Sequence, residues 1–335
     1  MAKREKPVTL RDIADSLGLS VNTISCALKD RNSIAPETIR RIKRKAEELG
    51  YIPNSIASSM RTGITKTIAI ILGDIVNAYF AIMIKELERI IREKDYTTII
   101  LVTEENAELE NKAIQTAISK NVDGIILFPT CRTETGINLI RKSDTPFILI
   151  GRHLRDSKMD FIVSDDINGG YIATKFLLDH GHKKILLFAG PDFVSSAFER
   201  KQGYIKAMEE AGVNDTDKLI ISCNIMVNED LNQIVSDVLQ TRRDFDAIFT
   251  YSDIIAFRII RIARQLHVKL PSIVGYDNIQ SKIDYGFDIP SVNIHKTLMA
   301  EQAVARLFNR IHHRKTADEY YNKIVPVDLS LNHGC

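Results

Sequence analysis

The sequence predicts two parts, a small all-helical head within residues 1–53 and an α/β core in the remainder of the 335-residue chain. The head is indicated by apolar residues at helical spacing in three short stretches before residue 50. The core is indicated by short apolar runs that alternate with helical stretches from residue 68 onward, a pattern typical of doubly wound parallel sheets. Apolar residues make up 44% of the chain, enough for substantial cores.

Two helices are predicted within residues 9–28, separated by a glycine. Thr9 is expected to cap the first helix, and Asp12, three residues on, completes a capping box. Gly18 ends this helix, and Ser20 is expected to cap the next one. The apolar stripes expected to face a common core are Leu10, Ile13, Ala14 and Leu17 in the first helix, and Ile24, Ala27 and Leu28 in the second.

The opposite face of the second helix carries Val21, Asn22, Ser25 and Cys26 near the helix start. In a helix-turn-helix, residues at these places read base edges in the major groove of DNA. On these residues alone, an ordinary helical hairpin inside a protein core remains an alternative.

A third helix is predicted from Pro36, a favoured first helical residue, to Gly50, which stops it. Its outer face is basic, which suits either a solvated face or phosphate contact. Residues 1–65 hold twelve Lys and Arg against seven Asp and Glu, a net +5, while the whole chain carries +2. The basic end is therefore the end expected to meet nucleic acid. The basic residues of the third helix are Arg40, Arg41, Lys43, Arg44 and Lys45.

Residues 54–61 combine small and polar residues with helix-compatible apolar ones. A segment this short does not hold a helix alone in water. A plain flexible linker is the alternative, and it suits residues 62–67 better than residues 54–61.

In the core, apolar runs predict strands and the stretches between them predict helices, in two successive series. The first series places strands at 68–72, 97–102, 124–128 and 147–150, with helices at 79–94 and 106–120 and a short helix after residue 128. The second places helices at 168–180, 198–211, 229–240 and 253–265, with strands at 185–190, 219–222, 247–251 and 272–276. Two parallel-sheet lobes follow from this repetition.

Composition and motifs exclude several classes of protein. Four cysteines without a C-x-x-C spacing indicate neither zinc nor structural disulfides, so no metal or cofactor is expected. We find no run long enough for a membrane span and no signal-like start, so a cytoplasmic protein without membrane contact is expected. No phosphate-binding, nucleophile-elbow or metalloprotease motif is present, which argues against an enzyme.

Residues 8–62 resemble the lactose-repressor/galactose-repressor (LacI/GalR) family of bacterial transcription regulators. The resemblance rests on VTLRDIADSLGLSVNTIS and on APETIRRIKRKAEELGYIPNSIASSMRT. It implies that residues 54–65 are a hinge helix and linker, and that the hinge becomes helical when two copies pack in the minor groove, where Met60 would wedge a base step. The DNA-binding residues that it implies are Thr9, Ser20, Val21, Asn22, Thr23, Ser25, Cys26, Asn54, Ala57, Met60 and Arg61. The family usually has Arg where this chain has Cys26, which puts the usual guanine contact in doubt.

The resemblance continues through the core, in VDGIIL from Val122, GHKKI from Gly181 and GYDN from Gly275. It implies lobes like those of periplasmic sugar-binding proteins, with an effector-binding and dimerisation core at 66–335. Lobe 1 is expected at about 66–162 plus 293–325, and lobe 2 at about 163–292 plus the C-terminal segment. The chain would cross between the lobes near 161–165, near 290–294 and close to residue 325.

Effector residues are expected where strands end, because open parallel sheets bind ligands outside the carboxyl ends of their strands. The family positions that touch effector match Tyr79, Phe80, Arg200, Asp253 and Asp277. The strand-end rule selects Asp74, Asn77, Tyr79, Phe80 and Arg152 in lobe 1, and Ser195, Phe198, Arg200, Asp253 and Asp277 in lobe 2.

Aromatic faces beside carboxylates and a guanidinium suit a sugar or sugar derivative, because its ring stacks and its hydroxyls pair with the polar groups. A purine stacked on the same aromatics is an alternative. Tyr79 and Phe80 are also compatible with core contacts, and Asp253 with a helix cap. Of these residues, Arg200 is the one for which a purely structural role is the least convincing explanation, because a structural ion pair does not have to lie at the edge of a cleft.

Two further departures from the family lie near the end of the chain. The segment between Pro271 and Ile273 is shorter than usual, which could reposition Asp277, and Ile294-His295 replaces a Gln-Pro pair. His295 is expected to be a structural histidine. No heptad repeat follows Val327, so a homodimer is expected rather than a tetramer.

The sequence therefore predicts a homodimeric regulator, foremost a repressor, that binds a roughly palindromic operator and responds to a small effector. An activator of the same architecture is an alternative. An enzyme that processes a sugar or nucleotide, with the head as an accessory domain, is a remote one.

Overall fold

The computed structural model describes residues 8–28, 34–52, 62–154, 158–213, 215–223, 229–286, 288–313 and 320–331. The chain divides into two compact units, Met1–Thr65 and Lys66–Cys335. The expected hinge helix lies outside the described residues, and so do Asn54, Ala57, Met60 and Arg61.

In the part of the first unit that the structure describes, three short helices surround a small apolar core. They are α1 (Leu10–Leu17), α2 (Val21–Ala27) and α3 (Pro36–Glu48). The expected capping box forms at Thr9 and Asp12, and Gly18 ends α1 in the left-handed region at φ 65°. Ala35 provides no side-chain cap for α3, whose first residue is proline as expected. The buried core is Ile13, Ala14, Ile24, Ala27, Ile42 and Ala46.

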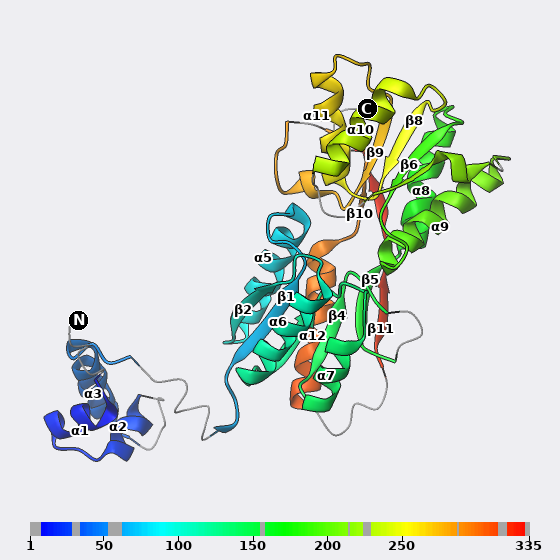
Figure 1. The fold of residues 1–335 in the computed structure, drawn as a ribbon. Coiled ribbons are helices and arrows are strands. Elements are labelled where there is room, and N and C mark those ends of the chain that lie inside the picture. The colour runs from blue at the N-terminus through cyan, green and yellow to red at the C-terminus, as the bar shows by residue number, and fades with distance from the viewer. Residues whose placement is uncertain are drawn as a thin grey trace. The chain divides into compact units, whose positions relative to one another are not determined.

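The second unit contains two six-stranded sheets with helices on both sides of each, as Figure 1 shows. The strand order is β11-β5-β4-β3-β1-β2 in one sheet, here called lobe 1, and β12-β10-β9-β8-β6-β7 in the other, lobe 2. All pairs are parallel except that of β10 with β12. The expected two-lobed, doubly wound fold is confirmed.

Lobe 1 is built on a nearly continuous apolar strand, β1 (Thr67–Leu72), whose alternate side chains face opposite helix layers. Ile68, Ile70 and Leu72 pack in one buried cluster with α5, and Ala69 and Ile71 pack in another with α6 and α7. The other elements are α5 (Ala78–Glu93), β2 (Thr97–Val102), α6 (Ala107–Ser119), β3 (Gly124–Leu127), α7 (Thr135–Ser143), β4 (Phe147–Ile150), β5 (Phe161–Ser164), α12 (Lys296–His312) and β11 (Asn322–Val325).

Lobe 2 repeats this arrangement, with α8 against α9 and α10 against α11. Its helices are α8 (Asp166–Asp179), α9 (Ser195–Glu210), α10 (Glu229–Thr241) and α11 (Asp253–Gln265), with 3-10 turns η1 (Thr216–Leu219) and η2 (Ile279–Ser281). Its strands are β6 (Ile185–Ala189), β7 (Ile220–Ser222), β8 (Ala247–Thr250), β9 (Ser272–Tyr276), β10 (Ser291–Asn293) and β12 (Asp328–Ser330).

The chain passes between the lobes three times, after β5, after β10 and between β11 and β12. At the second passage His295 adopts φ 52°, and its Nε2 lies 2.5 Å from Asp328 Oδ1, next to the third passage. His295 thus contacts the neighbouring crossing segment, just beyond the end of β10, and is not among the residues that line the pocket described below.

Two helix starts differ from the expectation. α9 begins at Ser195 rather than near Phe198. Its N-cap is Val194, whose apolar side chain cannot form a capping hydrogen bond, so the sequence gives no signal for this helix start. α8 begins at Asp166 rather than near Asn168, because Asp165 caps it by accepting a hydrogen bond from Asn168 N. No helix among the described residues is both long and apolar enough to cross a membrane.

Candidate functional site

The candidate nucleic-acid interface is the outward face of α2. Val21 is 43% exposed and Asn22 is also exposed, while Ser25 and Cys26 are half-buried. The Cys26 thiol lies 3.9 Å from Asn22 Oδ1, one helical turn away, and donates toward it. The amide oxygen of Asn22 faces the thiol in this contact, so its NH₂ group takes no part in it.

Three other residues of the expected interface hold the helix starts. Ser20 Oγ accepts from Thr23 N at 3.1 Å and lies 2.8 Å from the Thr23 hydroxyl. The Thr9 hydroxyl donates to Asp12 at 2.7 Å, and this bond lowers the pKa of Asp12 together with a stronger one from Thr9 N. Ser20 and Thr23 therefore fix the start of α2, and Thr9 fixes the start of α1.

The candidate ligand site is a pocket between the strand ends of the two lobes. Its free volume is about 30 Å³, room for only a water or two, so a larger ligand requires the lobes to part or side chains to move. Its lining comes from both sheets: Asp74, Asn77, Tyr79, Phe80, Glu105, Phe128, Gly151, Arg152, Ser196, Arg200, Tyr251, Ser252 and Asp277.

Aromatic rings form the lobe 1 side of this pocket. Tyr79 and Phe80 lie at the start of α5, where Asn77 Oδ1 caps the helix by accepting from Tyr79 N at 3.0 Å. Phe128 packs edge-on against both rings, at centroid distances of 6.2 and 5.3 Å. Gly151 has φ 71°, and a Cβ there would lie 2.5 Å from the Tyr79 hydroxyl, so only glycine leaves the ring its place.

Arg152 follows β4 and forms a two-point ion pair with Glu105. Its Nη1 donates to Glu105 Oε2 at 2.7 Å and to the Pro129 carbonyl at 3.1 Å, while Nη2 donates to Glu105 Oε1 at 3.0 Å. Both side chains are buried. Burial alone would lower the pKa of Arg152, but the Glu105 carboxylate raises it above the usual value.

Arg200 also forms a structural ion pair, although a structural role was the least expected one for this residue. Its Nε donates to Asp166 Oδ1 at 2.8 Å, and Nη2 lies 3.4 Å from Asp277 Oδ1. The guanidinium is 3.6 Å from the ring centroid of Tyr276 and donates from Nη1 to the Tyr251 carbonyl at 2.6 Å. Arg200 therefore both lines the pocket and holds α8, α9 and β8 together.

Asp277 reaches the pocket despite the shortened segment before β9. Lys296 donates to the Asp277 carbonyl and, at 3.2 Å, to the Asn278 carbonyl, while Asn278 N donates to Ser291 Oγ at 2.9 Å. These bonds secure a left-handed turn with φ 93° at Asp277 and 47° at Asn278. The turn places the carboxylate beside Arg200.

Three expected effector residues do not line the pocket. Ser195 Oγ accepts from His153 N at 2.9 Å, and Phe198 lies half-buried near the Lys201 ammonium. The alternative role expected for Asp253, a cap on α11, is not found, because no side chain caps this helix. Asp253 accepts from Ser291 at 2.6 Å and from Ile279 N at 2.8 Å, so it supports the turn that carries Asp277.

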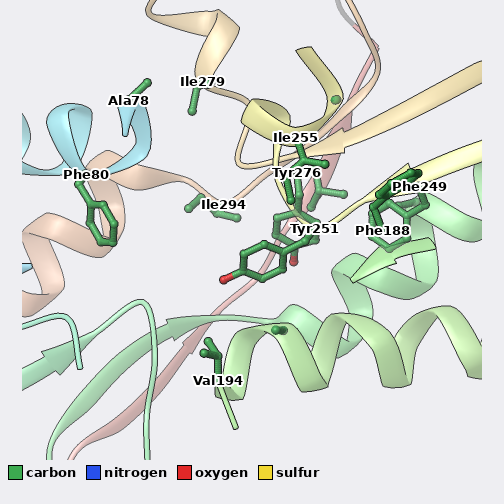
Figure 2. Close-up of a cluster of buried hydrophobic side chains, with 14 of the residues drawn as sticks. Ala78, Phe80, Phe188, Val194, Phe249, Tyr251, Ile255, Tyr276, Ile279 and Ile294 are labelled. Carbon is green, nitrogen blue, oxygen red and sulfur yellow. The ribbon is translucent and has the colours of Figure 1, made fainter. Parts of the chain in front are cut away.

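Six lining residues were not among the expected ones: Glu105, Phe128, Gly151, Ser196, Tyr251 and Ser252. Five of them follow β2, β3, β4 and β8, so the strand-end rule, applied to every residue after every strand, would have found them. Figure 2 shows Tyr251 turned away from Phe188 and Phe249 of the lobe 2 core, toward the side where Phe80 lies. Ser196 lies on the first turn of α9, whose start was expected later.

The two lobes also meet beside the pocket. His153, after β4, has Nε2 2.7 Å from Glu199 Oε1 on α9, and this hydrogen bond raises the pKa of His153. Arg132, after β3, lies 4.4 Å from the ring centroid of Phe193, before α9. Both contacts join lobe 1 to lobe 2, so both stabilise the arrangement of the lobes seen in this structure.

A larger hollow, of about 250 Å³, lies on lobe 1 beside the start of β4. Its acidic centre, Asp160, accepts from Arg306, Arg310 and Tyr321 N. Parallel sheets bind ligands at the carboxyl ends of their strands, and this hollow lies at the opposite ends. We therefore do not regard it as a ligand site. No group of three or more His, Cys, Asp or Glu in the described part of the chain is arranged to hold a metal ion.

Comparisons with known proteins follow the division into head and core. Residues 9–54 match the family profile described as bacterial regulatory proteins, lacI family. Residues 65–330 match the profile described as periplasmic binding proteins and sugar binding domain of LacI family.

Individual proteins are similar over nearly the whole chain. The HTH-type transcriptional repressor PurR of Pasteurella multocida (strain Pm70) is 29% identical over 310 residues, 91% of this chain and 92% of the relative. The lac repressor dimer bound to operator and the anti-inducer ONPF is similar in fold, with a TM-score of 0.84 at 18% identity over 98% of both chains. A complex of the transcriptional regulator CelR with cellobiose gives 0.71 at 23% identity, over 98% of this chain and 100% of that one.

Proposed function

The chain belongs to the LacI family of bacterial regulatory proteins, DNA-binding repressors with an effector-binding core, and from this premise we propose how its residues divide the work. The head binds a roughly palindromic operator through α2, and the pocket between the lobes binds a small effector that sets operator affinity. The family is one of regulators and not of enzymes. A chromosomal target implies action in the cytoplasm.

The assignment of base contacts to α2 is supported by its exposed face. Val21 suits a thymine methyl group, and the free amide donors of Asn22 suit adenine. Cys26 is a weak donor in place of the family's usual Arg, so these two residues carry more of the discrimination. The wedge role of Met60 remains part of this proposal.

The single observation that carries the effector assignment is the pocket lined from both sheets, with aromatic rings on one side and hydrogen-bonding groups around it. The faces of Tyr79 and Tyr251 suit the apolar face of a sugar ring, and Asp74 and Asp277 suit its hydroxyls. We therefore propose a sugar or sugar derivative as the effector.

A purine is the second candidate. It is favoured by the same rings, because a flat base stacks on aromatic faces, and by the similarity to proteins named PurR. Amide and carboxylate groups such as Asn77 and Asp277 suit the edges of a base as well as hydroxyls.

The proposed coupling is a shift in population between lobe arrangements. A ligand that touches both lobes favours closure, which the contacts of His153 and Arg132 also favour. The linker joins lobe 1 at Lys66, whose N–H donates to Asp123 at 2.8 Å and whose carbonyl accepts from Thr97 N at 2.9 Å. A movement of lobe 1 is thus passed to the chain that leads to the head.

A homodimer is proposed because two half-sites of a palindrome require two heads related by twofold symmetry. The solved lac repressor dimer on its operator has the same fold and supports this assembly. Whether effector releases DNA or recruits it decides between repressor with inducer and repressor with co-repressor; an activator is the remaining alternative.

Selection of full-length protein on randomised duplexes tests the DNA half, and a symmetric consensus is expected. The effector half is tested by thermal shift with cellobiose, D-xylulose, hypoxanthine and guanine, followed by operator titration with any that stabilises. Asp277→Asn should abolish both the stabilisation and the response while operator binding without ligand persists. If no symmetric consensus emerges, the proposed operator is refuted; if Asp277→Asn responds like wild type, the assignment of the pocket is refuted.

A further inference from the structure

The two arginines of the pocket are each neutralised by carboxylates of the same chain. Arg152 makes three hydrogen bonds, two of them to Glu105. Arg200 donates to Asp166 and to the Tyr251 carbonyl and lies within 3.4 Å of Asp277. Since a guanidinium has five N–H groups, each arginine keeps donors for a ligand, but neither offers an unbalanced positive charge.

The pocket as a whole is not cationic. Its lining contains two arginines and three carboxylates, Asp74, Glu105 and Asp277, which gives a net charge of −1 when all are ionised. Directly behind the lining, the buried charged side chains include Asp166, Asp253 and Lys296, which add no net positive charge. An anionic ligand would add like charge to a buried site, where screening by water is weak.

The position of Glu105 is fixed by the local backbone conformation and by its neighbours. Glu104 and Glu105 both adopt left-handed conformations, at φ 50° and 54°, which side-chain-bearing residues rarely do. A Cβ on Gly73 would lie 2.2 Å from Glu105 Oε1, so the glycine leaves room for the carboxylate. Arg132 Nε donates to the Glu105 carbonyl at 3.2 Å. Several local features thus combine to hold this carboxylate on Arg152.

We propose that the pocket takes effectors without an anionic group, and that Glu105 sets this selectivity by holding Arg152 away from anions. The ligand class is an uncharged hydrogen-bonding molecule, such as a free sugar or a purine base, and phosphate esters and carboxylates are excluded. This inference rests on the proposed effector role of the pocket.

The test compares anion binding by full-length wild type, Glu105→Gln and Asp74→Asn, with inorganic phosphate and D-glucose 6-phosphate as probes. Both variants remove one negative charge, but only Glu105→Gln frees an arginine; Asp74 bonds to Val76 N and not to a guanidinium. In calorimetric titrations we expect no saturable phosphate binding by wild type or Asp74→Asn, and saturable binding by Glu105→Gln with a Kd at least about tenfold below the highest phosphate concentration used.

Each other outcome overturns the proposal. Saturable binding of either probe by wild type would show that anions are accepted, equal gains in both variants would assign the effect to net charge alone, and no gain in either would deny Glu105 its role. If Glu105→Gln does not fold, Glu105→Asp, whose shorter carboxylate reaches Arg152 less well, should show a smaller gain of the same kind. Operator binding of the same samples without ligand is measured separately, so failure of the regulator assignment is seen independently.

Discussion

The Arg200 guanidinium donates to the Asp166 carboxylate at 2.8 Å in a buried contact that joins α9 to the start of α8. Two glycines allow the two helices to approach this closely. A Cβ on Gly170 would lie 2.0 Å from the Arg200 carbonyl oxygen, and one on Gly203 would lie 2.0 Å from the Ile167 carbonyl oxygen. The backbone contact of α8 with α9 and the ion pair beside the pocket are therefore one structure.

We expect Arg200→Ala to lower the free energy of unfolding by about 3 to 5 kcal/mol, because Asp166 is left buried without its partner. Urea unfolding of a double-mutant cycle with Asp166→Ala measures this. The double variant should be more stable than the sum of the single losses predicts. Additive losses would mean that the two side chains act independently.

Gly170→Ala should destabilise the core by about 3 kcal/mol, since the added methyl group meets a backbone carbonyl that cannot turn aside. The control is Lys175→Ala on the same helix, whose ion pair with Asp179 is exposed and should matter little. Comparable urea midpoints for the two variants would contradict the close crossing.

Asp253 makes stability depend on pH. Burial and the nearby Asp277 carboxylate raise the pKa of Asp253 to about 7. Because this pKa is above the unfolded value, protonated Asp253 stabilises the fold fully below about pH 4. As pH rises to about 7 this contribution to the free energy of unfolding is lost, by about 4 kcal/mol in all. Asp253→Asn should remove this slope, so the variant gains on wild type between pH 4 and 7. Parallel pH profiles of unfolding would contradict the assignment.

The architecture could be predicted because its signals are local. The β1 run is buried on both faces and reads as continuous apolar sequence, and Thr9, Ser20 and Pro36 mark helix starts in the head. The start of α9 could not be predicted, because Val194 forms no side-chain cap and the start is fixed by packing against α8. Tertiary contacts decide such boundaries, and one sequence does not contain them.

His153 and Glu199 give the contact between the lobes a pH dependence of the same sign as that of Asp253. The hydrogen bond to Glu199 raises the pKa of His153, and the Asp166 carboxylate adds to this effect. The pair therefore stabilises the closed core below the unfolded pKa of histidine, and this stabilisation is lost as pH rises through the folded pKa. The difference in unfolding free energy between wild type and His153→Gln should be larger at pH 5.5 than at pH 8.5. A constant difference would exclude the pair as a source of pH dependence.

Asn22→Ala should relax one symmetric position of the operator, at a cost of about 1 to 3 kcal/mol in discrimination, because the base loses its paired donor and acceptor. Selection on randomised duplexes measures the preference at every position. Cys26→Ser is the matched control, since serine keeps a donor facing Asn22. An unchanged consensus for Asn22→Ala would show that the amide does not read a base.

The pocket was predictable in outline but not in its electrostatics. The strand-end rule selected Arg152 and Arg200, but nothing in the sequence pairs Arg152 with Glu105, 47 residues away. The same rule selected Asp253, whose carboxylate faces inward to Ser291 instead. The end of a strand fixes where a residue lies; the direction of its side chain depends on neighbours from other segments.

The three passages between the lobes have a consequence for folding during synthesis. The edge strand β11 pairs with β5, more than 150 residues earlier, and β12 pairs with β10. On the ribosome both sheets therefore remain one strand short until the last dozen or so residues that form them emerge. Apolar edges stay open during that time, and such edges recruit other chains. Premature termination near residue 320 would leave both lobes incomplete at once. Neither sheet of the core can therefore be completed before this short segment has been synthesised.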